Sequence, residues 1–64
     1  MCLSTAYLNK KEEALIAARY VDSIKVEGGK VILTDVMGAV TEIEGSIDYV
    51  DLTGGSVIIA TDAN

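Results

Sequence analysis

The fold is decided by the stretch Ser23-Ile24-Lys25-Val26-Glu27-Gly28-Gly29-Lys30-Val31-Ile32-Leu33-Thr34. Apolar and charged residues alternate before the two glycines, and alternation with a period of two is typical of a strand with one buried and one exposed face. Gly28-Gly29 separates this run from a second apolar run, and two residues that can adopt positive φ are what a tight hairpin turn requires. The stretch therefore predicts a β-hairpin whose buried face carries Ile24, Val26, Val31 and Leu33.

Runs of strand length flank this hairpin on both sides. Val, Ile and Thr, whose branched side chains favour strands, account for 19 of the 64 residues. We predict further strands at residues 2–8, 40–44, 47–52 and 56–60, with turns near residues 9–10, 36–39 and 53–55. No linker or internal repeat divides the chain, so we expect one all-β domain over residues 1–64, a small meander or barrel-like sheet of about six or seven short strands.

Residues 12–24 fit two structures. A helix would place apolar residues on one face at Ala14, Ala17, Ala18, Val21 and Ile24, and Glu and Ala are good helix formers. A strand would use Ala14, Ile16, Ala18 and then Val21, with a change of direction near Arg19-Tyr20. Periodicity alone favours the helix over the strand.

Charge and composition exclude several classes of function. The chain has ten acidic and five basic residues, which gives a net charge of −5, and it has no His. Nucleic acids and anionic membranes attract a positive field, so we expect neither as a partner. The absence of His removes the commonest general base and every Ser/His/Asp or Cys/His catalytic set, so we do not expect an enzyme.

The sequence also indicates a compartment and an assembly state. It lacks an apolar run of about 20 residues and the basic start of a signal peptide, so we expect a cytoplasmic protein. Apolar residues occupy both faces of several predicted strands: Ile32 lies between Val31 and Leu33, and Ile58 lies between Val57 and Ile59. A lone sheet of this size cannot cover both faces, which predicts a two-fold homodimer.

Cys2 is the candidate metal ligand. Its thiol lies beside a nitrogen donor, which is its own amine if Met1 is removed, or its deprotonated amide with the Met1 amine in reserve if Met1 stays. Thiolate and nitrogen donors in a plane suit Ni(II), and two chains at a two-fold axis would supply two of each. The alternative is that Cys2 is a small buried apolar residue at the start of a strand. The carboxylates Asp22, Asp35, Asp48 and Asp51 lack calcium-loop spacing and are better explained as exposed and turn residues.

Two stretches carry a resemblance to a known family: Met1-Cys2-Leu3-Ser4-Thr5-Ala6-Tyr7-Leu8 and Val26-Glu27-Gly28-Gly29-Lys30-Val31-Ile32-Leu33-Thr34-Asp35. With them the chain resembles the CooT family of small nickel-binding proteins, whose founding member is an accessory to maturation of nickel carbon monoxide dehydrogenase. The similarity continues through Glu42–Gly45 and Ile47–Leu52. It implies a mainly β, dimeric fold that binds nickel through Cys2, and it favours a strand for residues 12–24.

Together these observations predict a cytoplasmic, homodimeric nickel-binding accessory protein, with Ni(II) held at the dimer interface by Cys2 and by Met1. A nickel enzyme is the expected client, which the resemblance does not identify. The alternative is a small β-barrel binding module with an RNA or a protein as partner and no metal role for Cys2. The acidic charge argues against RNA.

Overall fold

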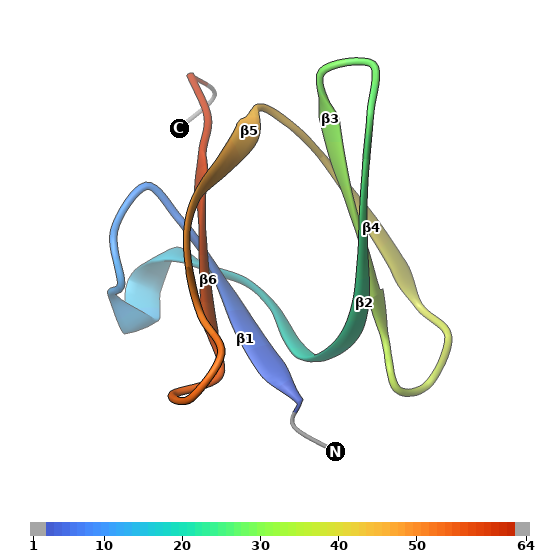
Figure 1. Ribbon diagram of the computed structural model, residues 1–64, viewed down its shortest axis with the longest axis vertical. Coiled ribbons are helices and arrows are strands. Elements are labelled where there is room, and N and C mark those ends of the chain that lie inside the picture. Colours follow the sequence, from blue (N-terminus) through green and yellow to red (C-terminus); the bar gives the residue numbers. More distant parts are fainter. Residues whose placement is uncertain (1–2, 63–64) are drawn as a thin grey trace.

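The computed structural model describes residues 3–62, which form six strands and one 3₁₀ turn (Figure 1). The strands are β1 (Ser4–Leu8), β2 (Ile16–Glu27), β3 (Lys30–Asp35), β4 (Val40–Glu44), β5 (Ser46–Asp51) and β6 (Ser56–Ala60), and the 3₁₀ turn η1 is Glu13–Leu15. The all-β prediction is confirmed. No helix in residues 3–62 is long and apolar enough to cross a membrane.

The strands form one sheet in the order β4-β3-β2-β1-β6-β5. All neighbours are antiparallel except β1 and β6, which are parallel. The long strand β2 pairs with β1 through its first half and with β3 through its second half, so the sheet bends into two layers. The strands β4 and β5 stand at opposite ends of the sheet order, yet Gly45 alone joins them. The sheet is therefore rolled into the barrel-like shape expected from the sequence.

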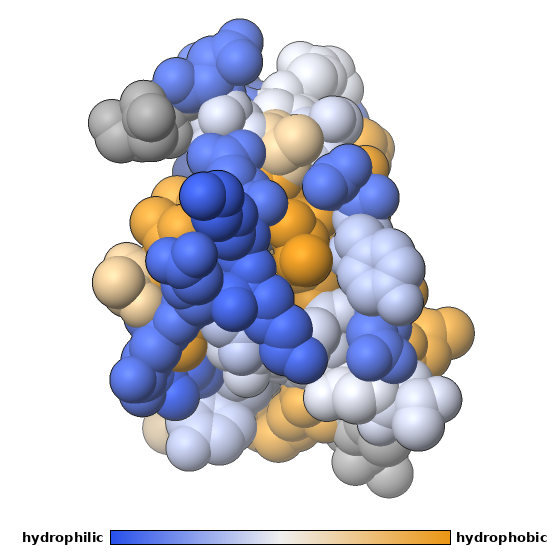
Figure 2. All heavy atoms as spheres, turned by 90° about the vertical axis from the view of Figure 1, so that its left-hand side faces the viewer, coloured by the Kyte–Doolittle hydropathy of each residue, from blue (hydrophilic) through white to orange (hydrophobic). Residues whose placement is uncertain are grey.

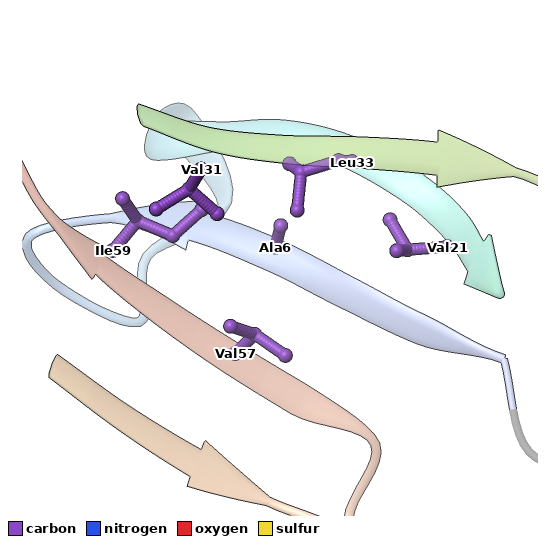
Figure 3. Packing of buried hydrophobic residues seen from close by; sticks show 6 residues of the cluster. All are labelled: Ala6, Val21, Val31, Leu33, Val57 and Ile59. Atoms are coloured by element: carbon purple, nitrogen blue, oxygen red, sulfur yellow. The ribbon is translucent and has the colours of Figure 1, made fainter. Parts of the chain in front are cut away.

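The core lies between the two layers and is aliphatic. Figure 3 shows Ala6, Val57 and Ile59 of β1 and β6 facing Val21, Val31 and Leu33 of β2 and β3. Each of these six side chains is at most 3% exposed. Full burial of a Val, Leu or Ile side chain contributes about 1.5–3 kcal/mol, so this small cluster supplies the main hydrophobic stabilisation of the chain.

The predicted hairpin is present, with one correction. Gly28 and Gly29 have φ of 57° and 78°, as a tight turn between β2 and β3 requires. Ile24 lies opposite Leu33 and Val26 lies opposite Val31. Val26 is nevertheless 57% exposed, so its predicted burial is wrong. The reason is that β1 pairs with β2 only as far as Val21, so at Val26 β2 has β3 on one side and no strand on the other.

The helix that periodicity favoured at residues 12–24 is wrong. After η1 the chain is a strand from Ile16 onward, which agrees with the structure implied by the resemblance. Ala18, Val21 and Ile24 all contact the core, although they are three residues apart. Register shifts between Ala18 and Val21 and between Val21 and Ser23 bring them to the same face, and Tyr20 has φ of 58° at the bend. Two bulges in a strand thus reproduce helical spacing.

Candidate metal centre

The predicted ligands Met1 and Cys2 lie outside the described residues. Leu3 is the first described residue. The chain enters β1 beside the turn between β5 and β6, where the Thr5 amide donates to the Gly55 carbonyl at 2.9 Å. The Leu3 carbonyl oxygen lies 3.3 Å from the position that a Cβ on Gly55 would occupy. The start of β1 is therefore tightly packed against this turn.

Large apolar side chains are exposed at this end of the molecule. Figure 1 shows the start of β1, the bend of β2 and the turns β3–β4 and β5–β6 together at the lower end. The Val36 amide donates to the Tyr20 carbonyl at 2.9 Å, which joins the β3–β4 turn to the bend. Leu52 lines a shallow pocket with Ser4 and residues 21–24. We define the apolar rim as five residues with their exposed fractions: Leu3 (38%), Tyr20 (62%), Val36 (53%), Met37 (87%) and Leu52 (80%).

The carboxylates occupy the turn and surface positions predicted for them. Asp35 Oδ1 accepts the amides of Met37 and Ala39 at 2.8 and 2.9 Å, and Asp51 Oδ1 accepts the Gly54 amide at 2.9 Å. Asp22 and Asp48 are exposed on strands. Among residues 3–62, no three His, Cys, Asp or Glu side chains come together as a possible metal site.

A polar pocket at the opposite end has a structural role. It is lined by Asn9, Glu44, Gly45, Ser46, Ala60, Thr61 and Asp62. The Thr61 hydroxyl donates to the Glu44 carbonyl at 2.7 Å, and the Thr61 amide donates to Asn9 Oδ1 at 3.0 Å. These bonds tie the end of β6 to the end of β4 and to the β1–η1 loop. The pocket marks where the rolled sheet closes.

Sequence reasoning missed a row of side chains on the outer face of the β5-β6-β1 layer. Ile16 lies opposite Tyr7, Tyr7 opposite Ile58, and Ile58 opposite Tyr49, so the four side chains share one face across four strands. Figure 2 views this layer from outside, and hydrophobic side chains reach the surface at its centre between hydrophilic ones. The tyrosines are far apart in sequence, and only the register brings Tyr7 and Tyr49 into one row.

Comparison with known proteins identifies the family. No curated protein matches the chain. A family model described as CO dehydrogenase accessory protein CooT matches residues 1–60 of the 64. The match includes the opening Met-Cys-Leu, the hairpin and all six strands. The chain therefore belongs to the CooT family of CO dehydrogenase accessory proteins.

Proposed function

We propose that this chain is a cytoplasmic nickel-binding accessory protein in which two copies hold one Ni(II) between their Cys2 residues. The observation that carries the proposal is the apolar rim, which includes Leu3, the first described residue, and the exposed turns at the same end of the fold. A nickel enzyme is the proposed client, and the family description names CO dehydrogenase.

The rim supports a dimer formed through this end of the fold. Full burial of a Leu or Met side chain contributes about 1.5–3 kcal/mol, so Met37 and Leu52 of two chains would contribute about 6–12 kcal/mol. Association costs about 4–15 kcal/mol in lost translational and rotational freedom, so the other rim residues are needed too. A two-fold interface uses the same surface of both copies. It would therefore bring the two chain starts close to one axis.

The donor set of two chain starts fits Ni(II). Each chain offers one thiolate and one nitrogen, and the pair offers two sulfur and two nitrogen donors for a square plane. The nitrogen is the Cys2 amide, with the Met1 amine in reserve, or the Cys2 amine where Met1 has been removed. A reducing cytoplasm keeps Cys2 as a thiol, ready to bind as a thiolate. The net charge of −5 also attracts a divalent cation.

Native mass spectrometry with and without Ni(II) tests the metal site. We expect one Ni(II) per dimer and a thiolate-to-nickel charge-transfer band in the absorption spectrum. Cys2→Ser should abolish the band and leave the melting temperature nearly unchanged, because Cys2 precedes the described core. Full nickel affinity in Cys2→Ser would disprove the assignment of the ligand.

Sedimentation tests the interface separately from the metal. The double variant Met37→Gln, Leu52→Gln should shift the chain toward a monomer of 6.7 kDa at micromolar concentration. Val26→Gln is the matched control, because Val26 is 57% exposed but lies beside the hairpin turn, away from the rim. A wild-type protein that sediments as a monomer, or a rim variant that stays as dimeric as Val26→Gln, would refute the proposed interface.

A further inference from the structure

The strand β5 has a free edge. Among the described residues, β6 is the only strand that pairs with β5. Residues 46–50 are all exposed, and Asp51 is half-buried. An unpaired strand edge presents a row of backbone N–H and C=O groups that can pair with a further strand.

The outer-face row of side chains ends at this edge. Ile16, Tyr7 and Ile58 are half-buried, because each has a neighbour of the row on an adjacent strand. Tyr49 is the last member and is 58% exposed. A strand added beside β5 would place a side chain directly next to Tyr49, and such cross-strand pairs with an aromatic residue stabilise sheets. The edge therefore offers an apolar contact as well as backbone groups.

The charged residues of β5 itself are all acidic. All five basic residues lie at or before Lys30, whereas residues 31–64 contain six acidic residues and no basic one. The two end strands carry Glu42, Glu44, Asp48 and Asp51. The Lys30 ammonium, which lies 3.7 Å from Glu42, is the one cation that forms an ion pair with these strands among the described residues. Asp48 forms no ion pair among them and lies at the bulge between Ile47 and Tyr49.

We infer that the free edge of β5 binds an extended segment of a partner protein in which Lys or Arg alternates with apolar residues. The backbone of the segment would pair with β5, an apolar side chain would pack on Tyr49, and a cation would pair with Asp48. A second copy of β5 is a poor occupant, because it would bring two more acidic residues to a strand that already carries Asp48 and Asp51, and facing like charges destabilise a strand pair. Charges and bulges of this kind protect edges against self-association, yet they leave this one open to a basic segment.

The inference does not depend on the proposed nickel site. It uses neither Cys2 nor any residue of the apolar rim, so each proposal can fail without the other.

Titration of the full, isotope-labelled chain with a blocked peptide of alternating Lys and Val, followed by amide chemical shifts, tests the inference. We expect the largest shifts at residues 46–51 and weaker binding as salt is raised, because exposed charge pairs are screened. Asp48→Lys should weaken binding about tenfold, which corresponds to about 1.4 kcal/mol. Tyr49→Ser should weaken binding by up to about fivefold, the range of one cross-strand pair. Asp48→Asn, expected to weaken binding less, replaces Asp48→Lys if that variant does not fold.

Asp22→Lys is the matched control. Asp22 is exposed on β2, and the change alters the net charge as much as Asp48→Lys does. It should leave peptide affinity nearly unchanged. Equal weakening by both variants, shifts centred away from β5, or equal binding of a Glu/Val peptide would overturn the inference. Concentration-dependent shifts at residues 46–50 without peptide, measured in the Met37→Gln, Leu52→Gln variant so that a dimer through the rim does not cause them, would overturn it as well, because they would identify a second copy as the occupant.

Discussion

Replacement of Gly45 by Ala should destabilise the fold more than any change at an open glycine. A Cβ at Gly45 would overlap the carbonyl oxygen of Ala60 and would lie 3.1 Å from its carbonyl carbon and 3.3 Å from Thr61 Cα. All three atoms are backbone, so relief requires the end of β6 to move. That movement would break the two bonds of Thr61 to Glu44 and Asn9, worth about 1 kcal/mol each. Residual strain adds about 1–3 kcal/mol, which gives a total of about 3–5 kcal/mol.

This loss is close to the whole stability expected for the chain. Domains have about 0.05–0.15 kcal/mol per residue, or about 3–10 kcal/mol for this length. At about 4–8 °C per kcal/mol, Gly45→Ala should lower the melting temperature by about 12 °C or more. Circular dichroism measures the melting temperature of each variant. All variants are compared at one protein concentration, because the melting temperature of a dimer depends on concentration.

Gly38→Ala is the control. Gly38 has φ of 88° with no atom within 4 Å of the added Cβ, so only the backbone penalty of about 1–2 kcal/mol applies. If Gly45→Ala and Gly38→Ala have the same melting temperature, the close contact of Gly45 with the end of β6 does not contribute to the stability of the fold.

Three further predictions concern ligands. Nickel affinity should rise with pH and fade in mild acid, because binding displaces the thiol proton of Cys2; titrations that give the same affinity at acidic and alkaline pH would contradict this. Extra residues before Met1 should weaken nickel binding if the terminal amine is a ligand and spare it if only the amide is, and calorimetry on tagged and cleaved protein distinguishes the two. Filter binding should detect no RNA affinity tighter than about 100 µM at physiological salt, and a sub-micromolar affinity that falls steeply with salt would favour the RNA-binding alternative.

The hairpin could be predicted because its signals are local. The turn is predicted from Gly28-Gly29 alone, because glycine can adopt positive φ without help from distant residues. The strands are predicted from the alternation of apolar and charged residues beside the turn. The exposure of Val26 could not be predicted, because it depends on where β1 ends. That limit is set by the pairing of Ser4 with Val21, which is a contact between distant parts of the chain.

The segment 12–24 shows how a bulged strand can mislead a periodicity count. Ala18, Val21 and Ile24 have the spacing of a helix face, and they do share a face. The extra residues Tyr20 and Asp22 produce that spacing within a strand. Positive φ at Tyr20 is unusual for a bulky residue, and nothing in its local sequence predicts it. The resemblance favoured a strand here because it compares the whole segment, irregularities included.

The candidate site likewise has one part that the sequence predicts and one part that only the structure shows. The choice of Cys2 followed from its chemistry and position, whereas the apolar rim is assembled from four separate segments and needed the structure. The acidic character of β4 and β5 was present in the sequence, because Lys30 is the last basic residue. The inference of a binding edge from these acidic residues required the structure, because only the order of strands in the sheet shows that one edge of β5 is unpaired.

The two proposals meet at the end of β5. The strand runs from Ser46, which follows Gly45 at the closed end, to Asp51, and the next residue, Leu52, belongs to the apolar rim. A partner segment paired along β5 would therefore have one of its ends beside the rim, where the chain starts emerge. A dimer formed through the rim would hold one metal site and present two such edges. If both proposals hold and binding of nickel alters the affinity for the partner segment, that coupling must be reciprocal. Peptide titrations of apo and nickel-loaded protein test this coupling: different affinities, with the difference removed by Cys2→Ser, would establish it, and equal affinities would refute it.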